Sequence, residues 1–450
     1  MTKSPFENLR IIDSTYVFAM PYAGGILGDM GAEVIKIEGP GHLDIVRGGQ
    51  FSGGFPDNNP GEDYWNRSAS FNLLNRNKKS LTLDLSKEEC REYLKELISI
   101  SDVMMENYTP RVMKRWGLDY ENIKKIKPDL ILISNTGYGH GEGPFSAYPA
   151  QATTQEATHG HCYITGYNND IPSKAGASYV DFLACWSGLF AVASALRYRN
   201  KTGKGQWIDI GMYQLGVMGT AEYIMDWQSN QNKSGRFGNR HPWRTPQGTY
   251  PCNGIDQWVV LSIGEDSQWA QLCEIMGKPE LASDEKFATL LNRRRYHDEI
   301  DQIISEWTKT KNKYEIMELL QNQNIPCGPV FDSADCNLNP HYQERGFIER
   351  VEYPEFRNIG TRKIMGRPWK GSKLDARVRA PIEPLGSSNS RILQELIGMS
   401  DKDYKDFISK GFIAEKPAEI REVPTSSLEE QVQSGRLAYF DADYKSKLGI

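Results

Sequence analysis

The chain has 450 residues, of which 53 are basic and 58 are acidic, so its net charge is −5 with histidine neutral. Hydrophobic residues make up 39% and charged residues 25%, which is enough apolar content to bury a large core and excludes a disordered chain. The acidic balance, without a basic block, argues against a nucleic-acid-binding surface.

The first forty residues predict a β-α-β unit. Residues 9–13 and 32–38 read as short apolar strands, and residues 20–30 carry small and apolar residues at helical spacing between them. A helical crossover of this kind favours parallel strands. The alternation continues with strands at 80–85, 102–106 and 130–134 and helices at 87–98 and 110–116. This pattern predicts a doubly wound α/β layer.

The next segments predict a loop, a long helix and a change of architecture. Residues 137–144 are rich in glycine and predict a loop; a long helix is expected at about 179–198 and a buried strand at 206–212. The polar stretch 228–244 predicts a domain junction. Beyond it the pattern is α+β, with strands near 248–252 and 257–263, helices near 267–276 and 305–322, a loop at 324–330 and a last small unit. From Ala414 the charged tail predicts an extended arm.

The cellular setting is expected to be the cytoplasm. The longest apolar run, 182–196, is shorter than the ~20 residues that a bilayer span needs, and the N-terminus lacks the basic and apolar stretches of a signal peptide. Seven scattered cysteines without a CxxC pair favour reduced thiols over disulfides or a zinc site. We therefore expect a globular protein that does not bind a membrane.

The glycines of the first β-α turn do not form a dinucleotide-binding motif. Gly24, Gly25 and Gly28 lack the GxGxxG spacing, so we interpret them as allowing close packing of helix on sheet. The glycine loop 137–143 leaves two interpretations open, an anion-binding loop and a flexible surface loop.

Polar residues elsewhere have an ordinary interpretation beside a functional one. Asp181, at the start of the most apolar helix, is either a helix cap or a functional carboxylate. His159 and His161 lack further ligands at metal-binding spacing and are interpreted as helix-edge residues. Lys36, Arg115 and Lys204 are interpreted as solvated charges rather than phosphate ligands.

Several segments taken together resemble the family III CoA-transferases, which include formyl-CoA:oxalate and carnitine CoA-transferases and α-methylacyl-CoA racemases. The motifs occur in the family's order and, with weaker matches, run from Leu9 to about Ile397. They are LRIID at 9–13, GDMGAEVIKIE at 28–38 with GPG at 39–41, NRNKKSLTLDL at 75–85, VMMENY at 103–108, GLDY at 117–120, GYG at 137–139, KTGKGQ at 201–206 and IPCGP at 325–329.

The resemblance implies a fold and an assembly. The fold is a Rossmann-like large domain built from residues 1–230 and 351–450, with a small α+β domain at 231–350 between them. The last part of the chain, 351–450, would hold the return to the large domain and a C-terminal arm. The resemblance also implies a dimer whose two subunits are interlocked like links of a chain.

The resemblance further implies the site residues. The family's catalytic aspartate precedes the long apolar helix, and Asp181 occupies that position. Val17, Asn107, Tyr108 and Arg115 match positions that line the CoA site. No cofactor and no metal are implied, because CoA thioesters are the substrates.

The substrate pocket departs from the family pattern. The residues expected there are Phe18, Gly137, Tyr138, Gly139, Gln151 and Trp243. Phe18 replaces the active-site glutamine of the oxalate enzyme, and Ala152, beside Gln151, replaces an acid. An arginine that binds the nucleotide in some members is Gly39 here. We therefore expect an acid that is larger or more apolar than oxalate.

The sequence thus predicts a CoA-transferase that moves CoA between an acyl-CoA and a free carboxylic acid through aspartyl anhydride and aspartyl-CoA intermediates. Backbone N–H groups of the loop 137–143 or of the Gly238 turn are expected to stabilise the oxyanions. Two alternatives remain: an α-methylacyl-CoA racemase, and a non-catalytic subunit of a heteromeric transferase. Its expected partners are the acyl-CoA and acid substrates and a second identical chain, or a sister subunit.

Overall fold

The computed structural model describes residues 4–48, 54–141, 143–176 and 179–450. The chain divides into two compact units, each of which is described by itself. The larger unit consists of Met1–His161, Ala175–Met225 and Pro340–Ile450, and the smaller unit of Cys162–Lys174 and Asp226–Asn339.

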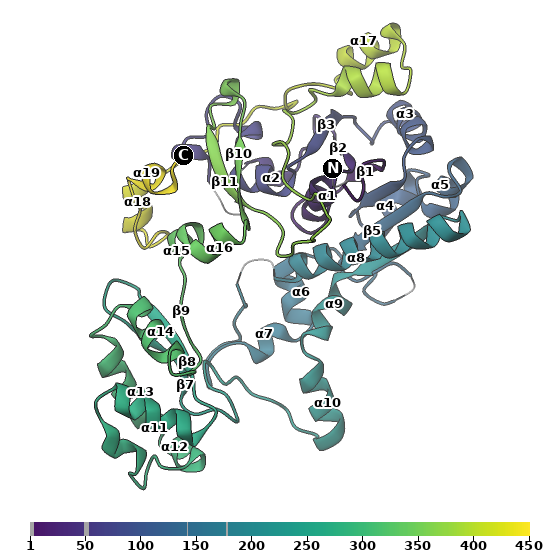
Figure 1. Ribbon diagram of the computed structural model, residues 1–450. Helices are drawn as coiled ribbons and strands as arrows, with labels where there is room; N and C mark the ends of the chain where they lie inside the picture. The colour runs from purple at the N-terminus through teal and green to yellow at the C-terminus, as the bar shows by residue number, and fades with distance from the viewer. Residues whose placement is uncertain (1–3, 49–53, 142, 177–178) are drawn as a thin grey trace. The chain divides into compact units, whose positions relative to one another are not determined.

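A six-stranded parallel sheet forms the centre of the larger unit (Figure 1). Its strand order is β3-β2-β1-β4-β5-β6, which is the doubly wound order that the sequence predicts. The strands are β1 Arg10–Ser14, β2 Glu33–Glu38, β3 Lys78–Thr82, β4 Val103–Glu106, β5 Ile131–Thr136 and β6 Gln206–Gly211. The expected α/β fold class is therefore confirmed.

Helices α1 (Ala19–Asp29) and α8 (Tyr179–Thr202) pack together on one face of this sheet. Every residue of α1 is buried. A Cβ atom at Gly24 would lie 2.6 Å from a carboxylate oxygen of Asp13, and one at Gly25 would lie 2.6 Å from the Leu74 carbonyl oxygen. The Gly24 contact confirms close packing of helix on sheet, whereas Gly25 allows α1 to approach the end of α2 (Ala69–Leu74).

Helix α8 is the one helix in the described part of the chain that is long and apolar enough, by length and composition, to cross a bilayer. Its buried residues recur at helical spacing and pack with α1 and α9. They are Val180, Ala184, Cys185, Gly188, Val192, Ala195 and Leu196. This helix therefore contributes to the core of the larger unit.

A second apolar cluster covers the other face of the sheet. It joins α3 (Glu88–Ser99), α4 (Pro110–Arg115) and α5 (Tyr120–Ile126) to α17 (Asp401–Ser409) from the end of the chain. Among the described residues, the other α-helices that lie wholly or partly in the larger unit are α2 Ala69–Leu74, α6 Ala152–Thr158, α7 His161–Ile164, α9 Met212–Met218, α10 Ala221–Asn230, α16 Pro340–Glu344, α18 Leu428–Gln433 and α19 Tyr444–Leu448.

The last part of the chain returns to the free edge of β3. Thr82 N–H donates to the Asn389 side-chain oxygen at 2.8 Å, and Ser388 N–H donates to the Ser80 carbonyl at 3.1 Å. The returning segment also forms an antiparallel pair, β10 (Ile348–Glu352) with β11 (Thr361–Met365). The edge of the sheet is thus covered by residues about three hundred positions away in the sequence.

The smaller unit is α+β. Its antiparallel sheet has the order β7-β8-β9, with β7 Gln247–Pro251, β8 Trp258–Ser262 and β9 Cys327–Pro329. Its helices are α11 Asp266–Ile275, α12 Leu290–Arg295, α13 His297–Thr308, α14 Lys313–Gln321 and α15 Ser333–Leu338. The strands β7 and β8 and helices α11, α13 and α14 share one apolar core.

Four details of the sequence prediction are wrong. Strand β6 is only partly buried, with Trp207 at 42% exposure, because among the described residues it is the last strand of the sheet and pairs with β5 alone. The helix expected at 305–322 is divided between α13 and α14, because Asn312 caps a new helix. The loop expected at 324–330 contains β9. The tail from Ala414 contains α18 (Leu428–Gln433) and α19 (Tyr444–Leu448).

Candidate active site

The carboxyl ends of β1 and β4 form the point where the strand order reverses. Strand β1 pairs with β2 on one side and β4 on the other, and Ser14 stands opposite Glu106 at their ends. In open parallel sheets, ligands bind in the crevice outside this reversal point. The residues that follow the two strands, Thr15–Val17 and Asn107–Tyr108, are therefore the first candidates for a binding site.

Asn107 and Tyr108 both contact the end of β1. The Asn107 side chain accepts the Tyr16 N–H at 2.9 Å and donates to the Tyr16 carbonyl at 2.8 Å. The Tyr108 hydroxyl lies 2.8 Å from the Ser14 hydroxyl, and its ring centroid is 5.9 Å from that of Tyr16. Burial raises the pKa of Tyr108. The structure thus brings two of the predicted site residues against the turn that contains a third, Val17.

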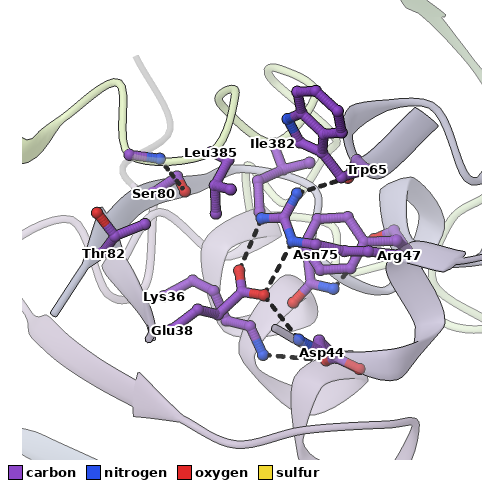
Figure 2. Close-up of polar contacts among 12 residues, drawn as sticks. Lys36, Glu38, Asp44, Arg47, Trp65, Asn75, Ser80, Thr82, Ile382 and Leu385 are labelled. Carbon is purple, nitrogen blue, oxygen red and sulfur yellow. Dashed lines mark hydrogen bonds and ion pairs between the residues drawn. The ribbon is translucent and has the colours of Figure 1, made fainter. Parts of the chain in front are cut away.

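The peptide at Val17 lies beside a buried group of charges. The Val17 N–H donates to both carboxylate oxygens of Asp44, at 3.2 Å each. Lys36 forms an ion pair with Asp44 at 3.2 Å, and Arg47 forms one with Glu38 at 2.7 Å; Figure 2 shows both pairs. All four charged side chains are at most 1% exposed. Lys36 is therefore buried and paired, and its interpretation as a solvated charge is wrong.

The charges of this group compensate one another. Burial alone would raise the pKa of Glu38, but its ion pair with Arg47 lowers that pKa to about 2. For Asp44, burial is the largest influence and raises the pKa despite the attraction of Lys36. The sequence does not predict that Asp44 and Arg47 are buried and paired, because isolated charged residues are usually exposed.

Arg115 is the last residue of α4, the helix that follows β4 through Asn107 and Tyr108. It is exposed.

Asp181 is the third residue of α8 and is half-buried. The helix begins at Tyr179, whose N–H donates to the buried Glu156 carboxylate of α6 at 3.2 Å. The first N–H groups of a helix have no partner inside the helix and favour a negative charge. Glu156 thus fixes the turn that carries Asp181, and the sequence offers no local signal for this long-range cap.

Buried polar groups gather around Glu156. In the described part of the chain, one Glu156 oxygen, both amide atoms of Gln155 and both ring nitrogens of His159 have no hydrogen-bond partner. Each of these three residues is at most 3% exposed. Burial and the neighbouring His161 lower the pKa of His159. His159 is the C-cap of α6, as its interpretation as a helix-edge residue predicts, and it is also part of a buried polar cluster.

The glycine loop adjoins a cavity of about 550 Å³ at the ends of β5 and β6. Tyr138 and Gly139 line this cavity together with His140, Ser187 and Asp209. His140 Nδ1 lies 2.9 Å from the Asp209 carboxylate. Gly137 lies at the base of the loop, where its carbonyl accepts the Tyr213 N–H at 2.8 Å.

The expected oxyanion donors are engaged within the chain. The Gly139 N–H donates to the Thr136 hydroxyl at 2.9 Å, and the His140 N–H donates to Asp209 at 2.7 Å. The Gly238 N–H donates to the Gly166 carbonyl at 2.9 Å. The expectation is therefore wrong for these three groups.

The other predicted pocket residues lie in different surroundings. Phe18 precedes α1 and packs, half-buried, against the core of the larger unit. Gln151 caps α6 and is exposed. Trp243 belongs to the smaller unit and is 72% exposed. In the same unit, Arg240 is already paired with Asp298 and Asp301.

No group of three His, Cys, Asp or Glu side chains that could hold a metal ion occurs among residues 4–48, 54–141, 143–176 and 179–450. All seven cysteines fall within these ranges, and none forms a disulfide.

Comparison with known proteins gives one consistent result. Residues 6–389 match the family described as CoA-transferase family III. The chain is 30% identical over 401 residues to the succinyl-CoA–D-citramalate CoA-transferase of Chloroflexus aurantiacus, covering 89% of this chain and 96% of that protein. It is 32% identical over 348 residues to the acetyl-CoA:oxalate CoA-transferase of Acetobacter aceti, covering 77% and 86%.

A solved structure agrees with these matches. The crystal structure of a CaiB/BaiF family protein from Brucella suis superposes with a TM-score of 0.78 at 29% identity, covering 88% of this chain and all of that one.

Proposed function

Because the chain belongs to family III of the CoA-transferases, we propose that it moves CoA from an acyl-CoA donor to a free carboxylic acid, with Asp181 as the nucleophile. Family membership and the named relatives establish an enzyme that transfers CoA. The position of Asp181 in the capped first turn of α8 is the observation that carries its assignment.

The first half of the proposed reaction loads CoA onto the enzyme. An Asp181 oxygen attacks the thioester carbonyl of the donor, the carbon–sulfur bond breaks, and CoA leaves as a thiolate. The thiolate then attacks the aspartyl carbonyl of the mixed anhydride, which releases the donor's acid. The product is an aspartyl-CoA thioester.

The second half transfers CoA to the acceptor. The acceptor carboxylate attacks the aspartyl thioester, CoA leaves again as a thiolate, and a second anhydride forms. Attack of the thiolate on the acceptor's acyl carbon gives the new acyl-CoA and returns Asp181 as a carboxylate. A carboxylate nucleophile suits these steps because each intermediate remains an anhydride or a thioester, whereas a serine ester would lose that energy.

We propose that the nucleotide end of CoA binds at the reversal point of the sheet. Asn107 contacts the backbone of Tyr16, next to Val17, and Tyr108 contacts Ser14; Arg115 lies exposed at the end of the next helix. Dinucleotides and related ligands bind at this position in doubly wound sheets.

The acceptor is proposed to be a carboxylic acid with an apolar body. The two relatives named above act on D-citramalate and oxalate. Phe18 offers an apolar surface at the start of α1.

A racemase remains the second candidate because of His159. Racemisation needs an acid/base group opposite the aspartate, and the His159 ring nitrogens are unpartnered within the described residues. Incubation with a 2-methylacyl-CoA in D₂O distinguishes the two reactions. Exchange of the α-proton without an acid acceptor would favour the racemase.

The assembly is proposed to be an interlocked homodimer in the cytoplasm. Large apolar side chains are exposed on the larger unit, with Phe190 at 76% and Met218 at 74%, and no strand among the described residues pairs with the outer edge of β6. A second copy would cover such a surface. Mixed tagged and untagged dimers should form no hybrids without unfolding, and rapid hybrid formation would contradict linked subunits.

The experiment that tests the proposed reaction is a trapping assay. The purified chain is incubated alone with succinyl-CoA or acetyl-CoA and hydroxylamine, and the modified peptide is identified by mass spectrometry. We expect a hydroxamate on Asp181 that appears only with a donor thioester. A hydroxamate on another residue would contradict the assignment, and transfer only after adding a second subunit would favour the heteromeric alternative.

A further inference from the structure

The turn between β1 and α1 contains a residue in an unfavourable backbone conformation. Val17 has a φ of 74°, in the left-handed region. For a β-branched residue this conformation is a clear outlier, because the side chain collides with the neighbouring peptide. Such strain persists only where the surroundings impose it, and it is concentrated at ligand sites.

The two residues before Val17 are bound from both sides. Asp13 accepts the Thr15 N–H at 3.1 Å and the Thr15 hydroxyl at 2.5 Å. The Lys36 ammonium donates to the Thr15 carbonyl. Asn107 binds both polar groups of the Tyr16 backbone, at 2.9 and 2.8 Å. These contacts fix the path into Val17 but do not reach its own N–H.

Asp44 is the side chain that binds the strained residue itself. Both of its oxygens accept the Val17 N–H at 3.2 Å. The carboxylate is held in turn by Lys36 at 3.2 Å, visible in Figure 2, and by the Val46 N–H at 3.2 Å. Asp44 is 1% exposed, so water does not substitute for these contacts.

We propose that Asp44 is a positioning residue for CoA binding, which holds Val17 in the left-handed conformation and so shapes the β1–α1 turn at the reversal point. The inference rests on the proposed function, in that CoA binds at this turn. Asp44 itself needs no contact with CoA, because its effect passes through the Val17 peptide.

The test compares two replacements of Val17 in the presence and absence of the Asp44 carboxylate. The D44N variant presents an amide N–H group where the Val17 N–H and the Lys36 ammonium both need an acceptor. The V17G variant adopts the left-handed conformation without strain, whereas the V17A variant keeps a Cβ atom and most of the strain. Both replacements remove the two γ-methyl groups of valine, and they differ only in the Cβ atom that disfavours the left-handed conformation.

Binding of CoA itself to the full-length chain is measured by calorimetry. We expect D44N to raise the Kd for CoA about tenfold, as loss of an imposed backbone conformation should. The Kd of V17G/D44N for CoA should lie within about threefold of that of V17G. The Kd of V17A/D44N should exceed that of V17A by about the factor by which D44N exceeds wild type. If D44N does not fold, D44E is used, because it keeps the charge that Lys36 needs but displaces the carboxylate by one methylene.

The control is Asp29, the last residue of α1. It is equally buried and is paired with Arg76 at 2.7 Å and Arg367 at 3.0 Å, but it lies at the far end of the helix. D29N should lower the melting temperature without changing the Kd for CoA.

Three results would overturn the inference. The first is wild-type affinity in a folded D44N protein. The second is that replacing Asp44 raises the Kd for CoA by the same factor with valine, alanine or glycine at position 17. Asp44 would then not act through the turn. The third is a wild-type chain that does not bind CoA, which would refute the proposed function as well and is thereby distinguished from the first two.

Discussion

The Glu156 carboxylate accepts the backbone N–H of Tyr179 at 3.2 Å, which makes a side chain of α6 the cap of the helix that carries Asp181. The contact joins residues 23 positions apart. The orientation of the proposed nucleophile therefore depends on a side chain outside its own helix.

Removing this cap should have a larger effect on the turnover number kcat than on the free energy of unfolding. We expect E156A to reduce kcat at least about tenfold, because small displacements of a nucleophile are costly, with little change in KM for the acyl-CoA. E156Q keeps an oxygen acceptor for the Tyr179 N–H and should stay within about threefold of wild type. Steady-state kinetics of both variants measures the difference.

The matched control is S400A. Ser400 caps α17, where its hydroxyl accepts the Asp403 N–H at 3.1 Å. Its loss should cost about 1 kcal/mol of stability and leave kcat unchanged. Equal kcat values for E156A and S400A would show that Glu156 is only a helix cap.

Asp181 should be indispensable for transfer. D181A and D181N should lose at least about a thousandfold in kcat, because no other group would form the anhydride. The fold and CoA binding should be nearly intact, since replacement near a helix start costs only about 1 kcal/mol. Coupled assays and CoA calorimetry check both statements, and substantial residual transfer would refute the mechanism.

The acid specificity should follow Phe18. An arylalkanoic acid should have a higher kcat/KM than oxalate, since each buried methylene contributes about 0.8 kcal/mol and a second buried carboxylate without a partner is unfavourable. Measuring oxalate, succinate and an arylalkanoic acid tests this order. F18Q should shift the ratio towards oxalate, whereas an unchanged ratio would mean that Phe18 only packs against the core.

The pH dependence of stability should reveal Glu106, which is fully buried at the end of β4. Burial raises its pKa from 4.5 to about 7. A carboxyl with a raised pKa in the folded state stabilises the protein fully below the unfolded pKa, and this contribution is lost as the pH rises through the folded value. Between pH 4.5 and 7 the loss should be about 3 kcal/mol at most.

Urea unfolding at several pH values measures this effect. The unfolding free energy of wild type should fall from pH 5 to pH 8 relative to that of E106Q, which has no charge to bury. The control is E121Q, whose parent side chain is 71% exposed and should follow wild type. Parallel curves for wild type and E106Q would show that Glu106 does not titrate in this range.

Local patterns were sufficient to predict the first β-α-β unit. The apolar strands around the glycine-containing helix are contiguous in the sequence, and Gly24 and Gly25 indeed permit contacts of 2.6 Å. The division between α13 and α14 was missed because neither Gly nor Pro marks it; Asn312, whose side chain accepts the Tyr314 N–H, is the signal. Ser427 and Glu430 form a capping box that could have indicated α18.

The site residues were predictable only where a motif names them. Val17 lies far in the sequence from Asn107 and Tyr108, which contact the residues just before Val17 because β1 and β4 are neighbours in the sheet. Asp44 and Glu156 carry no local signal, because their roles come from backbone N–H groups of other segments. A valine with positive φ is equally invisible, since its side chain disfavours that conformation.

The covering of β3 by the returning chain has a consequence for the order of folding during synthesis. All residues of the smaller unit precede Pro340, so that unit can leave the ribosome complete. The larger unit cannot be complete before Glu383, Ser388 and Asn389 are synthesised, because these residues bind the edge of β3. A nascent chain that stalls between these points would carry an open strand edge, which is a template for aggregation.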